Sequence, residues 1–200
     1  MKQFLETICI VDGVAQHLDY HQRRLDATLM HFYPVHRHTW LLEKCIEVPD
    51  SFQEGRVRCR IVYDAYTLDI QYFHYEKRNV TTLKLVEVPN GYNYSFKYAD
   101  RSVIDQLYNL HGDVDDILMT KAGWIMDSSY ANIAFEKNGR WYTPSIPLLA
   151  GTTWKRLIQQ GKIIPQPIHQ DELKSFTGFR IFNAMMHFDE QEIIFVKNIG

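Results

Sequence analysis

The sequence lacks the features that mark several large classes of protein. Its 200 residues contain no apolar run long enough to cross a lipid bilayer. The formal net charge is -2 at pH 7, whereas general nucleic-acid binders usually carry a clear basic excess. It has no Gly-rich phosphate loop, no G-x-S-x-G elbow and no DNA-reading motif. We therefore expect neither a membrane nor a nucleic acid as partner.

Cysteine is also scarce. Cys9, Cys45 and Cys59 are an odd number, widely spaced and each in an apolar context. This pattern favours buried free thiols in a reducing compartment over a disulfide framework or a zinc site. The opening residues place an acidic side chain where a signal peptide has its apolar core, so we expect a cytoplasmic protein without an export signal.

Three histidines lie close together near the first proline but match no standard zinc spacing, so no metal is predicted: His31, His36 and His38. The 46% of hydrophobic and 23% of charged residues are ordinary for a globular chain. The 14% of aromatic residues is high and suits a large core or a planar ligand.

The first ninety residues are predicted to form a small α+β lobe. A strand is expected at 4–11, and three more strands at 57–63, 66–75 and 80–88 are expected to form an antiparallel meander. Asp19 is expected to cap a helix that stops at Pro34, and Thr39 to cap a second helix that runs to residue 46. The turn residues 89–91 then mark a boundary between lobes 1–90 and 91–200.

The second lobe is predicted to be rich in strands. It opens with a short strand at 92–97, and Asp100 is expected to cap the helix that follows. Hairpins are predicted around Ala122-Gly123 and Asn138-Gly139, and a helix opens at Thr152. Short strands at 163–168, 179–183 and 192–196, and one short helix near Asp171, complete this lobe.

Three sites in the second lobe carry groups that together suit a pyridoxal-phosphate enzyme. Lys97 lies among aromatic residues, which can desolvate an amine and favour Schiff-base chemistry. Asp127 ends a predicted strand, where a carboxylate can hold a pyridinium N–H. The turn at Gly151, with Thr152 and Thr153, opens a helix and suits a phosphate. Taken singly, a surface lysine, a turn-capping aspartate and an ordinary N-cap explain these residues better.

Arginines of the first lobe extend this set. Arg24, on the first predicted helix, can add a charge-assisted phosphate contact, or it can simply face solvent. Arg58 and Arg60 alternate with apolar residues, so both point to one face of a strand. Two arginines on one face can bind substrate carboxylates, and an exposed sheet face is the alternative.

The order of these motifs resembles the class IV, fold-type IV pyridoxal-phosphate enzymes, which include branched-chain and D-amino-acid aminotransferases and aminodeoxychorismate lyase. The matching segments run nearly end to end: Phe4-Leu-Glu-Thr7-Ile, His21-Gln-Arg-Arg24-Leu, Lys97, Asp127-x-x-x-x-Asn132-Ile, Leu149-Ala-Gly-Thr-Thr153 and Phe182-Asn183-Ala184-Met185. The last segment is similar to the lyase branch. The chain departs from the family pattern in beginning at the first segment, which shortens the small lobe, in having Asp127 in place of Glu, and in having Trp154 in place of Arg.

The resemblance implies an α+β fold of two lobes with the cofactor pyridoxal 5'-phosphate between them: a small α+β lobe, and a larger lobe that is a strand-rich pseudo-barrel with helices. Lys97 would be the Schiff-base lysine and the general base and acid. Asp127, with Asn132, would hold the pyridine nitrogen, and the phosphate would be bound by a separate group: Arg24, Gly151, Thr152, Thr153 and Asn183. Arg60, with Arg58 and Thr7, would receive a small amino or amino-chorismate substrate.

These roles predict a lyase that converts 4-amino-4-deoxychorismate to pyruvate and 4-aminobenzoate for folate synthesis, acting as a homodimer. An amino-acid transaminase of the same fold, a homologue that binds the cofactor without turnover, and a purely structural domain remain alternatives. The spacing of the motifs does not choose between lyase and transaminase.

Overall fold

The structure is a computed structural model that describes residues 1–35 and 40–200. The chain divides into two compact units. The first contains Met1–Glu76 and Phe96–Asp100, and the second contains Lys77–Ser95 and Arg101–Gly200. The predicted boundary at residue 90 does not coincide with this division, because the chain leaves the first unit after Glu76. The segment that carries Lys97 packs with the first unit.

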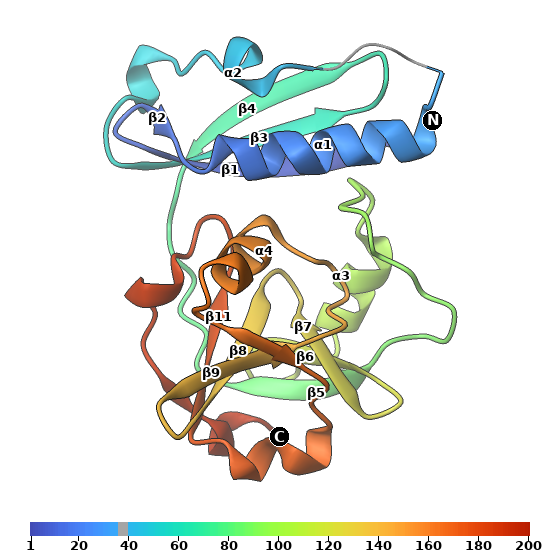
Figure 1. The fold of residues 1–200 in the computed structure, drawn as a ribbon, viewed down its shortest axis with the longest axis vertical. Coiled ribbons are helices and arrows are strands. Elements are labelled where there is room, and N and C mark those ends of the chain that lie inside the picture. The colour runs from blue at the N-terminus through green and yellow to red at the C-terminus, as the bar shows by residue number, and fades with distance from the viewer. Residues whose placement is uncertain (36–39) are drawn as a thin grey trace. The chain divides into compact units, whose positions relative to one another are not determined.

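A four-stranded antiparallel sheet forms the centre of the first unit (Figure 1), in the order β2-β1-β3-β4. The strands are β1 (Phe4–Val11), β2 (Val14–Ala15), β3 (Arg56–Tyr63) and β4 (Leu68–His74). The antiparallel pairing of β3 with β4 confirms the first two strands of the expected meander, and β1 confirms the strand expected at 4–11. The turn between β1 and β2 has positive φ at Asp12 and Gly13, as a tight hairpin requires.

One long helix, α1 (Leu18–Phe32), packs on this sheet. Its N-cap is His17 and not Asp19; Asp19 lies in the first turn, where a negative charge still favours the helix dipole. The second helix, α2 (Leu42–Cys45), is shorter than predicted, and a 3-10 turn follows at Asp50–Phe52. The expected cap Thr39, like His36 and His38, lies outside the described residues.

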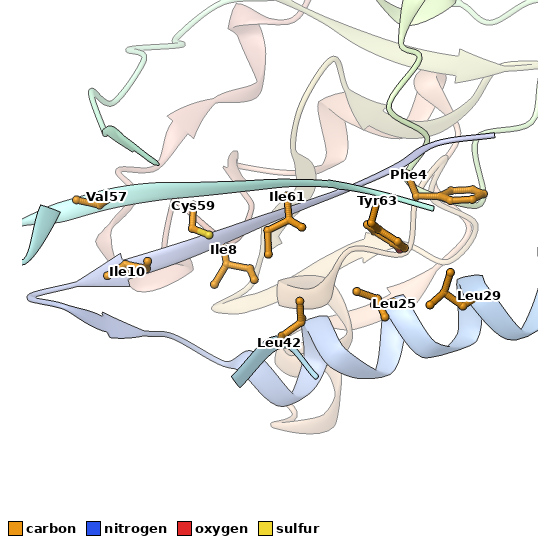
Figure 2. Close-up of a cluster of buried hydrophobic side chains, with 10 residues drawn as sticks. All are labelled: Phe4, Ile8, Ile10, Leu25, Leu29, Leu42, Val57, Cys59, Ile61 and Tyr63. Atoms are coloured by element: carbon orange, nitrogen blue, oxygen red, sulfur yellow. The ribbon is translucent and has the colours of Figure 1, made fainter. Parts of the chain in front are cut away.

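The core of the first unit lies between α1 and the sheet. Alternate residues of β1 and β3 point to the helix, because successive side chains of a strand point to opposite faces. Leu25 and Leu29 of α1 meet them, and Leu42 of α2 closes one end. Figure 2 shows the buried set: Phe4, Ile8, Ile10, Leu25, Leu29, Leu42, Val57, Cys59, Ile61 and Tyr63. Glu6 occupies the same row of β1 as Phe4 and Ile8, so a carboxylate lies within an apolar layer.

The strand predicted at 92–97 is not formed. The side chain of Asn93 accepts a hydrogen bond from the Ser95 N–H (2.8 Å), and this local turn replaces a strand ladder. Pairing begins only with the Lys97 segment, through a bridge between Phe4 and Tyr98 and a 2.8 Å bond from the Leu5 N–H to the Lys97 carbonyl. This segment therefore lies beside the start of β1.

The second unit holds two sheets (Figure 1), with orders β10-β9-β8-β11-β12 and β5-β6-β7. Its strands are β5 (Leu83–Glu87), β6 (Asp116–Lys121), β7 (Trp124–Ser128), β8 (Asn132–Lys137), β9 (Arg140–Pro144), β10 (Ile164–Gln166), β11 (Gly178–Phe182) and β12 (Ile194–Phe195). The meander predicted for the first lobe is wrong at its last strand, because β5 pairs with β6, in parallel, and not with β4.

Both predicted hairpins of the second unit are confirmed. The turns of β6–β7 and β8–β9 have positive φ at both central residues, which is the backbone twist that two-residue hairpins need. The helices are α3 (Ser102–Tyr108), whose N-cap is Arg101 and not Asp100, and α4 (Thr152–Gln159). Short 3-10 segments occur at Gln170–Ser175, Phe188–Glu190 and Val196–Asn198.

No helix in the described ranges is both long enough and apolar enough to span a membrane. All three cysteines are free thiols; Cys9 and Cys59 are buried and Cys45 is half-buried. Burial raises the pKa of the Cys59 thiol to about 12, which leaves it an inert part of the core at neutral pH.

We expect Leu25→Ala to lower the free energy of unfolding by about 2–5 kcal/mol, because it removes a fully buried side chain and leaves a cavity. Met30→Ala on the same helix is the matched control, since Met30 is 78% exposed and its loss should change stability by less than about 0.5 kcal/mol. Denaturant unfolding followed by circular dichroism measures both. Equal effects of the two variants would contradict the described core.

Candidate functional site

Asp127 is the centre of a hydrogen-bonded group in the second unit. It lies near the end of β7 and is 5% exposed. The side-chain amide of Asn132 donates to Asp127 Oδ1 (2.7 Å), and the Leu149 backbone N–H donates to Asp127 Oδ2 (2.8 Å). The Asn132 amide also donates to the Leu149 carbonyl (2.9 Å). Asp127 and Asn132 therefore fix the loop that precedes α4.

The charge of Asp127 is not balanced by the residues around it. In the part of the chain that the structure describes, no cationic side chain forms an ion pair with this carboxylate. Burial raises the pKa of the Asp127 carboxyl to about 7, although hydrogen bonds from Leu149, Asn132 and Leu148 act in the opposite direction. A buried carboxylate of this kind favours either a proton or a cationic partner.

The loop after Leu149 comes very close to Asn132. A Cβ atom on Gly151 would lie 2.3 Å from Asn132 Oδ1, so only glycine fits beside this amide. Gly151 is the N-cap of α4 and supplies no side-chain cap, and Thr152 and Thr153 open the helix with buried side chains. The first N–H groups of a helix have no acceptor within the helix, so this end of α4 can donate to an anion.

Asn183 follows the strand that pairs with β8. Asn132 lies directly opposite Phe182 in this pairing, which brings Asn183 to the same edge of the sheet as Asn132. The Asn183 side-chain oxygen accepts hydrogen bonds from the N–H groups of Met185 (2.8 Å) and Met186 (3.1 Å). The Asn183 side chain thus shapes its own loop, and its predicted role with a phosphate stays a prediction.

In the first unit, a second buried carboxylate binds Arg24. Arg24 Nε donates to Glu6 Oε1 (2.7 Å) and Arg24 Nη2 to Glu6 Oε2 (2.5 Å). His21 Nδ1 lies 2.6 Å from the same Oε2. Burial acts to raise the pKa of Glu6, but the charge and hydrogen bonds of Arg24, together with His21, outweigh it and lower that pKa to about 2.

The ionised state of Glu6 determines the form of His21. A carboxylate can only accept hydrogen bonds, so the proton between Glu6 and His21 lies on Nδ1. Burial lowers the pKa of His21, and the positive charges of Arg24 and Lys97 add to this effect, against the attraction of Glu6. His21 is therefore a neutral imidazole at pH 7, and the Lys97 ammonium lies close enough to influence it.

Lys97 itself is half-buried between two half-buried aromatic residues, Phe96 and Tyr98. The Phe96 ring stacks on His31 at a centroid distance of 4.7 Å, and the Tyr98 ring lies 5.4 Å from Phe4. These contacts attach both neighbours of Lys97 to α1 and β1. The aromatic surroundings of Lys97 inferred from the sequence are present. Within this segment, strand pairing is limited to the bridge between Tyr98 and Phe4.

The three residues predicted to bind substrate share one face of the first sheet. Thr7 lies directly opposite Arg60 in the β1–β3 pairing, and Arg58 is two residues away on the same strand. Arg58 is exposed and places its guanidinium 4.7 Å from the centre of the Phe73 ring. Glu6 and Arg24 belong to the opposite, helix-facing side. The sheet thus separates the proposed substrate arginines from Arg24.

The structure groups the predicted site residues into two sets, each within one unit. The first unit holds Arg24 with Lys97, and Thr7 with Arg58 and Arg60. The second holds Asp127, Asn132, Gly151, Thr152 and Thr153, with Asn183 at the same sheet edge. The sequence interpretation missed Glu6 and His21 as functional candidates. Their signal was present: Glu6 lies at an inward position between apolar residues, and His21 precedes Arg24 by three residues.

Trp154, which stands where the family pattern has Arg, belongs to the interior of the second unit. Its indole N–H donates to Thr143 Oγ1 (3.1 Å), and its ring packs on the core around Ala134 and Leu157. Thr143 in turn donates to the Ile133 carbonyl (2.8 Å). The tryptophan thus anchors α4 to β8 and β9.

We expect the unfolding free energy of the protein without ligand to fall as pH rises through the range set by Asp127. The folded pKa of about 7 exceeds the ordinary aspartate value of 3.8, so the folded state holds this proton more tightly and loses stability until pH passes about 7. The loss should be on the order of 3 kcal/mol between pH 5 and pH 8. Asp127→Asn should remove it.

Denaturant unfolding at the two pH values measures this difference. Asp171→Asn, which removes an 81% exposed carboxylate of the same unit, is the control and should keep the wild-type dependence. An unchanged pH dependence in Asp127→Asn would show that Asp127 titrates normally.

Comparison with known proteins agrees with these observations. The family model for amino-transferase class IV matches residues 3–189. An uncharacterized protein of Haemophilus influenzae is 37% identical over 186 residues, which is 92% of this chain and 98% of that protein.

Two solved structures extend the comparison. The crystal structure of a "putative 4-amino-4-deoxychorismate lyase" from Haemophilus somnus 129pt is similar with a TM-score of 0.87 and 33% identity, covering 94% of this chain and 98% of that one. A hypothetical aminotransferase from Mycobacterium tuberculosis, in its PLP-bound form, has a TM-score of 0.75 at 15% identity, covering 98% and 81%. The predicted family and α+β fold are confirmed, and the chain belongs to the amino-transferase class IV family.

Proposed function

We propose that this protein uses pyridoxal 5'-phosphate to convert 4-amino-4-deoxychorismate to pyruvate and 4-aminobenzoate, a precursor of folate. Bound pyridoxal phosphate supplies an electron sink for the bond-breaking step at the substrate's α-carbon. The protein supplies binding, orientation and proton transfer. Membership of the class IV family makes the chain an enzyme of the aminotransferase and lyase group, and the particular reaction is our proposal.

Asp127 is the observation that carries the cofactor assignment. Its buried carboxylate is held by neutral donors and, within the described chain, has no cationic side chain as partner. A protonated pyridine nitrogen is a planar cation with one N–H donor, which matches the requirement of this carboxylate. Asp127 would keep that nitrogen protonated, and Asn132 would orient Asp127.

Each unit has a group of donors that suits a phosphate. The backbone N–H groups of Gly151, Thr152 and Thr153 at the start of α4 form one group, and a helix N-terminus favours a dianion there. Arg24 forms the other group, with a guanidinium that Glu6 already orients. Asn183 shapes the neighbouring loop at the same sheet edge.

Lys97 is assigned the covalent attachment of the cofactor through Nζ and the movement of a proton at the substrate's α-carbon. Its half-buried position, with Phe96 and Tyr98 on either side, reduces the hydration of the amine. Arg60, with Arg58 and Thr7 on the same sheet face, is assigned a substrate carboxylate. A bidentate arginine contact would fix the direction of the substrate.

The lyase reaction is favoured over other class IV reactions by two observations. The Haemophilus somnus structure named for 4-amino-4-deoxychorismate lyase matches over 98% of its length. The segment Asn183-Ala184-Met185 is similar to that of the lyase branch. An amino-acid aminotransferase is the second candidate, because the matching family model and the mycobacterial structure carry that description.

The proposal includes a homodimer, as expected from the resemblance to class IV enzymes. Light scattering on the purified protein should give about twice the mass of the 23.7 kDa chain. A monomeric mass with full activity would contradict this part of the proposal.

Purified protein mixed with pyridoxal phosphate should show a visible absorption band that is absent from the free cofactor. Lys97→Ala should abolish this band and lower kcat by at least about a hundredfold, because it removes both the covalent attachment and a general base. Lys121→Ala is the control, since Lys121 is exposed at a hairpin. A variant Lys97→Ala that retained the band would show that another lysine binds the cofactor.

Product analysis separates the two candidate reactions. Incubation with 4-amino-4-deoxychorismate should release pyruvate and 4-aminobenzoate in equal amounts. Amino-group transfer to a 2-oxo acid without pyruvate release would favour the aminotransferase. A normal absorption band with neither activity would indicate a homologue that binds the cofactor without turnover.

A further inference from the structure

The Glu6–Arg24 pair raises a physical question. A carboxylate beside an arginine offsets its positive charge, which should weaken any binding of an anion by Arg24. Yet Glu6 is fully buried, Arg24 is nearly so, and both ends of the pair are held by short hydrogen bonds. Burial of an ion pair carries a desolvation cost that offsets the attraction between the charges, so the Glu6–Arg24 pair by itself adds little to stability.

The geometry of the pair gives an answer. A guanidinium has five N–H donors in a fixed planar fork. Glu6 takes the donors on the Nε side, through Nε and Nη2. The edge formed by the two terminal nitrogens points away from Glu6, and this edge matches the spacing of two oxygens of a phosphate.

His21 completes the arrangement from the other side of Glu6. Its Nδ1–H donates to the Oε2 atom that also accepts from Arg24 Nη2. Glu6 is therefore held at Oε2 by two donors from α1, three residues apart. Because His21 and Glu6 are almost fully buried, neither can turn to follow Arg24 if its guanidinium moves.

We propose that Glu6 is a positioning residue for the cofactor phosphate, which fixes the guanidinium of Arg24 in one orientation, with His21 holding Glu6 in place. This inference rests on the proposed function, because it requires a phosphate-bearing ligand. It also predicts the direction in which phosphate binding changes when Glu6 is removed. If Glu6 only neutralised Arg24, its removal would strengthen phosphate binding; if it positions Arg24, its removal weakens it.

The test compares the dissociation constants of pyridoxal phosphate and pyridoxal, which differ only in the phosphate. Glu6→Gln should raise the constant for pyridoxal phosphate by about tenfold or more, as for other hydrogen bonds that orient a ligand-binding group. The constant for pyridoxal should change less than about twofold. Binding is followed by the visible absorption band, and circular dichroism checks the fold.

Two further variants keep the test decisive. Asp19→Asn breaks the exposed pair with Arg23, one residue from Arg24 on the same helix, and should leave both constants unchanged. Glu6→Asp keeps the negative charge but shortens the side chain, so it cannot hold both nitrogens in the same place. It should also weaken pyridoxal phosphate selectively, and it serves where Glu6→Gln does not fold.

A wild-type preference for pyridoxal phosphate that Glu6→Gln and Glu6→Asp both retain would overturn the inference and leave the proposed function intact. Tighter binding of pyridoxal phosphate by Glu6→Gln would also overturn it, since that result indicates charge neutralisation. Wild-type protein that binds neither compound would overturn the proposed function and the inference together.

Discussion

The candidate site depends on the cost of removing a carboxylate from water. Asp127 is buried at the end of β7, and a buried charge is stable only where hydrogen bonds or an opposite charge replace its hydration. Asn132 and the Leu149 N–H meet part of this need. In doing so they connect the end of β7, the start of β8 and the loop before α4. The hydrogen bonds that stabilise the Asp127 carboxylate therefore also fix the position of the N-terminus of α4.

The buried carboxylates of the two units differ in their partners and in their pKa. Glu6 has a cation, Arg24, and its pKa is lowered to about 2, so it is charged throughout the physiological range. Asp127 has neutral donors alone, and its pKa is raised to about 7. The charge of Glu6 is balanced by a residue of its own unit, so Glu6 can serve as a fixed support. Asp127 is balanced between two protonation states, which suits a group that receives a cationic ligand.

Much of the fold could be predicted because its signals are local. The alternation along β3, the turn residues of both hairpins and the glycine before α4 each act over a few residues. The pairings that were missed join distant segments: β5 with β6, and Tyr98 with Phe4. The network of Glu6, His21 and Arg24 also joins a strand to a helix. A motif can place each residue along the chain, but only packing shows that Glu6 meets Arg24 and that Trp154 turns inward to Thr143.

Gly151 has a consequence for how sequences of this kind are compared. Since a side chain at position 151 would collide with the amide of Asn132, the residue types at these two positions depend on each other. A homologue with alanine at 151 would need a smaller residue at 132, and would then lose a donor to its aspartate. We therefore expect a glycine at this position to accompany an intact Asn–Asp pair, even in homologues whose sequences between the two positions are too different to align. The glycine at 151 would then indicate a carboxylate twenty-four positions earlier in the sequence.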